Sequence, residues 1–213
     1  MSDPIQDLNR RAVHASATLV AKATPADLAR PTPCDGWTLG DLIAHMTAQH
    51  RGFAAAAVGD GATRSHWEVD VASSDPVGDH LQAVDAVLDA FASEGVLEAR
   101  FLLPEIFTEA TFAGTDAIGF HFIDYLVHAW DVARSLDVSW APDDDLAAAA
   151  LTLTRSIPNG PERLEPGAAF APAGTPTPDA DPFDEVLVLL GRSPAWSARA
   201  TAPPAATTSA RKG

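Results

Sequence analysis

Two histidines and two aspartates recur at helical spacing within residues 119–137. His121, Asp124, His128 and Asp131 are separated by three, four and three residues, so on an α-helix they lie along one face, about one turn apart. The residues around them are largely apolar, which predicts that this polar face is at least partly enclosed. Enclosed imidazole and carboxylate groups need partners, and a divalent metal ion is one candidate.

His45 is the histidine best placed to complete such a site, from a second helix expected over residues 39–58. Helical bundles build metal sites from inward-facing side chains on different helices. His45, Asp124 and His128 would supply nitrogen, oxygen and nitrogen ligands and leave positions open, which is the pattern of a catalytic site. Zn²⁺ suits these ligands best, while Ni²⁺, Fe²⁺ and Mn²⁺ stay open.

Other interpretations of these residues compete with the metal site. Asp124 and His128 could form only an intrahelical ion pair, with His45 as a hydrogen-bonded core residue. His121 could replace Asp124 as a ligand, or it could contact a ligand side chain without binding the metal itself. Asp131 could hold the ring of His128, bond the backbone of a loop, or be a solvated charge on the helix face.

Cys34 lies just before the helix of His45, in a loop shaped by two prolines and Gly36. A catalytic thiol needs a base or a positive field nearby, and the sequence offers only Asp35 beside it. We therefore interpret Cys34 as structural or incidental. Trp37 is interpreted as a packing anchor for the same loop.

The spacing of apolar residues predicts a chain that is mainly α-helical. Helices are expected over about 5–23, 39–58, 76–93, 115–136, 143–156 and 183–190. Thr38 with Asp41 resembles a capping box, and Thr115 and Asp116 are candidate caps for the helix of His128. Residues 94–113 are ambiguous between strand and helix, and 167–172 are a candidate short strand. The domain prediction is one helical bundle over 1–193, with a short irregular C-terminal segment and a disordered tail at 194–213.

Bulk composition narrows the class of protein. The chain has 213 residues and a formal net charge of −15 without any basic stripe, which argues against nucleic-acid binding. No apolar run is long enough to span a membrane, and no signal peptide is evident at the N-terminus. A single cysteine excludes an internal disulfide framework and favours a reducing, cytoplasmic location.

Two motifs together resemble a known family. Residues 32–45 read TPCDGWTLGDLIAH and residues 124–133 read DYLVHAWDVA; both are similar to the DinB-like superfamily, in the branch of mycothiol-dependent maleylpyruvate isomerase and its metal-binding relatives. The late segments GAAF at 167–170 and LLGRSP at 189–194 are also similar to that branch. The resemblance covers roughly residues 5–195.

This resemblance implies a four-helix bundle of up-down-down-up type that holds a divalent metal, usually zinc. Its ligands would be the histidine of the first motif and the acidic residue and histidine of the second, here His45, Asp124 and His128. The isomerase has Glu at the acidic position, so Asp124 departs from it. The shorter side chain could weaken binding, shift the metal or pass the role to His121.

The resemblance also implies chemistry between a thiol cofactor and a small-molecule electrophile. Mycothiol or a similar low-molecular-weight thiol would be the cosubstrate, because a metal lowers the pKa of a thiol and supplies a nucleophile. An anionic thiol or substrate would need arginine, and the candidates are Arg51, Arg134, Arg155 and Arg163.

Three functions remain open from the sequence. The first is a metal-dependent thiol transferase or isomerase. The second is a non-catalytic, metal-containing protein for small-molecule binding or resistance. The third is a bundle that has lost its metal and acts as a homodimer. The presence of both His45 and His128 favours the first two over the third.

Overall fold

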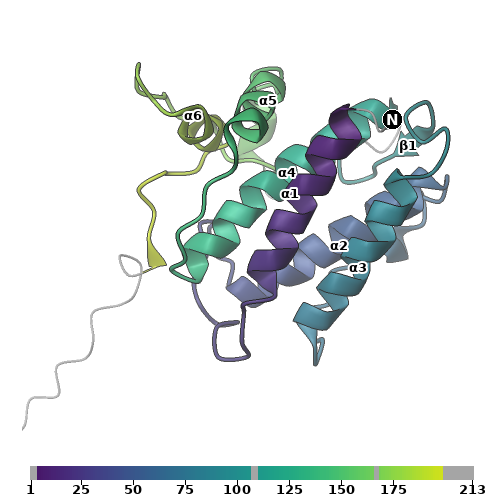
Figure 1. The fold of residues 1–213 in the computed structure, drawn as a ribbon, viewed down its shortest axis with the longest axis horizontal. Helices are drawn as coiled ribbons and strands as arrows, with labels where there is room; N and C mark the ends of the chain where they lie inside the picture. Colours follow the sequence, from purple (N-terminus) through teal and green to yellow (C-terminus); the bar gives the residue numbers. More distant parts are fainter. Residues whose placement is uncertain (1–3, 107–109, 166–167, 199–213) are drawn as a thin grey trace, which may run out of the picture.

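The computed structural model describes residues 4–106, 110–165 and 168–198, and the chain in these ranges is mainly helical (Figure 1). Its helices are α1 (Pro4–Val20), α2 (Leu39–Ala57), α3 (Pro76–Phe91), α4 (Gly114–Ser135), α5 (Asp144–Thr154) and α6 (Pro182–Leu189). The remaining elements are the 3₁₀ turns η1 (Arg64–Trp67) and η2 (Pro161–Leu164) and the strands β1 (Arg100–Leu102) and β2 (Thr111–Ala113). The prediction of a mainly α-helical chain is confirmed. None of the described helices is long and apolar enough to cross a membrane.

Helix α4 is the central element of the fold. It packs against α1 and α2 within the bundle and against α5, which with α6 forms a separate pair beside it (Figure 1). Residues of α4 contribute to all three clusters of the hydrophobic core, for example Ile118, Phe122 and Tyr125. Because α4 is covered on nearly every side, its polar side chains must find partners inside the protein.

A capping box fixes the start of α2, as the sequence predicts. The Thr38 hydroxyl accepts a hydrogen bond from the Asp41 backbone N–H, and the Asp41 carboxylate accepts one from the Thr38 N–H at 2.9 Å. The preceding loop closes on itself through a bridge between Pro31 and Thr38, and Gly36 supplies its left-handed turn with a φ of 75°. This arrangement fixes the orientation of α2, and so of His45 two turns further along it.

The start of α4 differs from the prediction that Thr115 or Asp116 caps it. The N-cap is Ala113, whose side chain makes no capping bond. Instead, the N–H groups of Gly114 and Thr115 donate to the carbonyl oxygens of Ala99 and Leu97, at 2.9 and 3.1 Å. Loop carbonyls therefore replace a side-chain cap at this helix end.

The structure resolves two ambiguous segments. Within residues 94–113, strands β1 and β2 pair in antiparallel fashion with Phe101 opposite Phe112, and the Phe101 side chain is fully buried. The short strand predicted over 167–172 is wrong for its described residues, 168–172. There the Ala171 carbonyl accepts from the Arg163 guanidinium at 3.2 Å, which also donates to Leu189. A buried arginine thus organises this segment in place of a sheet.

The domain boundary predicted at residue 193 stays a prediction. The Pro194 carbonyl accepts a hydrogen bond from Arg134 at 2.5 Å, and Trp196 packs against the core cluster of α4, α5 and α6. Residues 199–213 of the predicted disordered tail lie outside the described residues.

Candidate metal centre

The structure brings together the three residues predicted as metal ligands. His45 projects from α2 and Asp124 and His128 from α4, and each offers a ligand atom within 4.8 Å of the other two. The closest pair is His128 Nε2 and Asp124 Oδ1, 3.3 Å apart. Two imidazoles and a carboxylate converging from two helices suit a divalent cation such as Zn²⁺, whose bonds to these groups are about 2 Å long.

The imidazole of His45 is the group with an unused lone pair. It makes no hydrogen bond with any described residue, although its ring lies 5.6 Å from that of His128, nearly perpendicular to it. Burial, reinforced by the nearby His128, lowers the pKa of His45 to about 4. His45 is therefore neutral at physiological pH, which is the form that binds a metal.

Asp131 orients His128 from the side opposite Asp124. Its Oδ2 atom lies 2.9 Å from His128 Nδ1, and the Asp131 side chain is fully buried. The expectation that Asp131 holds the ring of His128 is thus confirmed, and the alternative of a solvated charge is wrong. A histidine that donates from Nδ1 to a carboxylate presents Nε2 as the ligand atom, as metal-binding histidines commonly do.

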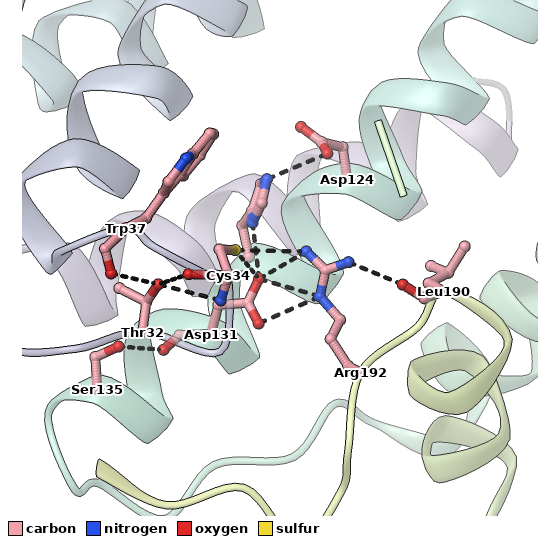
Figure 2. Close-up of polar contacts among 9 residues, drawn as sticks. Thr32, Cys34, Trp37, Asp124, Asp131, Ser135, Leu190 and Arg192 are labelled. Atoms are coloured by element: carbon pink, nitrogen blue, oxygen red, sulfur yellow. Dashed lines mark hydrogen bonds and ion pairs between the residues drawn. The ribbon is translucent and has the colours of Figure 1, made fainter. Parts of the chain in front are cut away.

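Arg192 is the partner of Asp131 that sequence reasoning missed. Its Nη2 atom lies 3.0 Å from Asp131 Oδ2, and its Nη1 donates to the Leu190 carbonyl at 3.2 Å (Figure 2). Burial alone would raise the pKa of Asp131, but the Arg192 guanidinium and His128 hold that pKa below its usual value. Arg192 lies within the LLGRSP segment that carried the family resemblance, and that was the available signal.

Cys34 lies in the same cluster, on the loop before α2 and next to Arg192 from the segment after α6 (Figure 2). Its sulfur lies 3.4 Å from Asp131 Oδ2 and 3.7 Å from Arg192 Nη2. The expectation that no positive field surrounds this thiol is therefore wrong. The loop carrying Cys34 is held by Thr32, whose hydroxyl bonds the backbone of Cys34 and Trp37 at 3.0 to 3.1 Å.

A second set of possible ligands overlaps the first. Cys34, His128 and Asp131 also offer ligand atoms within 4.8 Å of one another. Arg192 already places a positive charge against both Cys34 and Asp131, so a cation there would be repelled. Among the described hydrogen bonds and ion pairs, Arg192 contacts none of His45, Asp124 and His128, so this set is the better candidate.

His121 belongs to a different cluster from the candidate ligands. Its Nε2 lies 3.1 Å from His50 Nδ1 and its Nδ1 lies 2.7 Å from Asn9 Oδ1, so both ring nitrogens already have partners. His50 in turn stacks on Tyr125, with ring centroids 3.8 Å apart. His121 therefore does not take the place of Asp124 in this structure, and His50 packs with the rings of His80, His121 and Tyr125.

The four arginines considered from the sequence lie elsewhere. Arg51 lines a small separate hollow with Asp70 and Asp79. Arg134 and Arg163 donate to backbone carbonyls, and the exposed Arg155 pairs with Glu185. None of them contacts the candidate ligands among the described interactions.

The sequence is similar to a known protein family and to a mycobacterial protein. Residues 9–133 match the family model described as the mycothiol maleylpyruvate isomerase N-terminal domain. An uncharacterised protein of Mycobacterium tuberculosis, present in strains CDC 1551 and H37Rv, is 32% identical over 191 residues, which is 90% of this chain and 98% of the relative.

A solved structure shares the fold. The crystal structure of the mycothiol-dependent maleylpyruvate isomerase superposes with a TM-score of 0.53 at 15% identity. The superposed part covers 70% of this chain and 66% of that one. At this level of identity the likeness bears on fold alone, and it agrees with the helical DinB-like fold expected from the sequence.

Proposed function

Because the chain belongs to the family of the mycothiol maleylpyruvate isomerase N-terminal domain, we propose that it is a metal-dependent enzyme that uses a low-molecular-weight thiol. Mycothiol is the thiol that the family name suggests. The reaction would be transfer of the thiol to a small electrophile or a thiol-assisted isomerisation. The observation that carries the proposal is the convergence of His45, Asp124 and His128 within 4.8 Å.

Each residue has a role in this proposal that follows from its surroundings. His45, Asp124 and His128 would hold the metal, for which Zn²⁺ fits the donor set best. A metal ion bound there would lower the pKa of a thiol and supply a nucleophile at neutral pH. Asp131 keeps His128 in the tautomer that presents Nε2, and Arg192 balances the charge of Asp131.

Metal content and thiol consumption together test the proposal. The protein is purified without chelator, its zinc content is measured by mass spectrometry, and it is then incubated with mycothiol and a panel of electrophiles. We expect about one zinc per chain and enzyme-dependent loss of thiol or isomerisation of the electrophile. His45→Ala and His128→Ala should lose both properties. His14→Ala is the matched control, because His14 is exposed on α1, away from the candidate ligands.

Two results would overturn the proposal in different ways. Zinc binding without any turnover would favour a non-catalytic metal-containing protein for small-molecule binding or resistance. A wild-type protein that neither carries nor tightly binds a divalent metal would exclude both metal-dependent functions.

A further inference from the structure

An open pocket of about 390 Å³ lies against the imidazole of His45. Its described lining residues are Gly36, Trp37, Asp41, His45, Val69 and Val71. This volume lies within the range of pockets that bind small molecules. One wall is the loop before α2 together with the first turns of that helix, and the other is the segment that follows η1.

Three large apolar side chains are exposed together in this pocket. Trp37, Val69 and Val71 keep 37%, 45% and 68% of their surface accessible. The Trp37 ring lies beside His45, with centroids 4.8 Å apart at an angle of 59°. The expectation that Trp37 only anchors its loop is therefore incomplete. Apolar side chains gathered in a concave site beside polar groups are typical of ligand-binding surfaces.

The charge in the pocket is negative. Its described lining includes no lysine or arginine, and Asp41 is its one carboxylate. The Asp41 carboxylate accepts hydrogen bonds from the hydroxyl and backbone N–H of Thr38, which lower its pKa, so it is ionised at neutral pH. Asp124, which also lies beside His45, is paired with His128 at 3.3 Å and is not among the described lining residues. The described lining therefore offers an anionic ligand no lysine or arginine to pair with.

From this juxtaposition we infer that the pocket binds an uncharged, planar apolar molecule, and that Trp37 is the residue that selects it. The partly exposed indole provides a flat face against which a planar group can stack, and Val69 and Val71 add apolar surface to the same pocket. The inference rests on the proposed function in one respect: it identifies this molecule as the electrophile of that reaction. Selection for apolar shape then occurs next to the residues proposed to hold the metal.

A pair of probes that share one ring system tests the inference. Binding of neutral 2-naphthalenemethanol and of anionic 2-naphthalenesulfonate is measured by calorimetry at pH 7, on protein purified without chelator and without added thiol. We expect the neutral probe to bind about tenfold more tightly or better, which corresponds to about 1.4 kcal/mol. Trp37→Ala should weaken its binding by about three- to tenfold, whereas Trp37→Phe, which keeps an aromatic face, should retain most of it.

A charge-introducing variant tests the electrostatic part of the argument. Val71→Lys places a cation at the pocket and should strengthen sulfonate binding by a few fold. Val58→Lys is the matched control, because Val58 is similarly exposed, at 73%, but lies at the far end of α2. Its sulfonate binding should not change.

Equal affinity for the two probes, or unchanged binding in Trp37→Ala, would overturn the inference. These results are separable from the proposed function, because the assay contains no thiol and records no turnover. A protein without zinc or turnover that still prefers the neutral probe would retain the pocket and lose only the enzymatic role.

Discussion

The imidazole of His128 donates a hydrogen bond from Nδ1 to Oδ2 of Asp131 over 2.9 Å, and both side chains are buried. The direction of the bond follows from chemistry, because an ionised carboxylate can only accept. Nε2 of the same ring is thereby left facing Asp124 at 3.3 Å. The candidate metal centre depends on this orientation as much as on the ligands themselves.

Asp131→Asn is expected to weaken metal binding without removing a ligand. An amide holds the His128 ring less strongly and can favour the other tautomer, and loss of such a partner typically costs about 10- to 100-fold in affinity. Zinc dissociation constants from competition with a chromophoric chelator would measure the change. Asp116→Asn, at an exposed carboxylate in the first turn of the same helix, should leave the constant unaltered. Equal constants for wild type and Asp131→Asn would contradict the positioning role.

Arg192→Met is expected to destabilise the fold strongly. The Arg192 side chain is only 9% exposed, and its removal leaves the buried carboxylate of Asp131 without its cation. Breaking a buried pair in this way costs about 3–5 kcal/mol in the free energy of unfolding, which urea denaturation measures. Arg155→Met removes a comparable pair on the surface, where Arg155 is 60% exposed, and should cost about 1 kcal/mol or less. Similar losses for both variants would show that Arg192 is not a buried structural cation.

Two glycines of α4 should respond in opposite directions to alanine. A Cβ on Gly114 would lie 1.8 Å from the Val96 carbonyl oxygen, so the backbone must move, and we expect a loss of about 1–3 kcal/mol. A Cβ on Gly119 would meet Leu153 at 3.8 Å, an ordinary contact, and should add about 0.5–1 kcal/mol through helix propensity. Urea denaturation of both variants measures the difference, and equal effects would refute the close packing of the α4 start.

Stability should fall in mild acid because of the buried histidines. Burial lowers the pKa of His80 to about 4 and that of His121 to about 3. The unfolded chain, with pKa values near 6.5, therefore takes up these protons first. Above about pH 6.5 these histidines are neutral in both the folded and the unfolded state, so they do not change the free energy of unfolding. That free energy declines as the pH falls from there toward the folded pKa values.

A variant at His80 isolates this contribution. His80→Leu should reduce the loss of unfolding free energy between pH 7 and pH 5, by about 1–2 kcal/mol. His14→Leu, at the exposed histidine of α1, should leave that loss as in the wild type. An unchanged pH dependence in His80→Leu would contradict the buried, neutral state of His80.

Local sequence signals predicted much of this structure. The apolar spacing located the long helices, and the capping box of Thr38 and Asp41 placed the start of α2 correctly. The spacing of Asp124 and His128 put both on one face, His45 was expected from a second helix of the bundle, and the family resemblance supported that choice. These features depend on short-range periodicity or on a recognisable motif.

The features that sequence reasoning missed depend on distant parts of the chain. Arg192 reaches Cys34 across a separation of 158 residues, and no local pattern predicts that contact. The start of α4 uses carbonyls of the preceding loop rather than a capping side chain. Trp37 resembles a core residue by type, and only the tertiary structure shows that its ring is exposed beside His45.

A crystal structure with anomalous diffraction data on either side of the zinc absorption edge tests the central claim most directly. The crystals would be grown from protein purified without chelator. The account predicts one anomalous peak between His45, Asp124 and His128, within bonding distance of all three. A fully ordered site without a peak, or a peak held instead by Cys34 and Asp131, would contradict it.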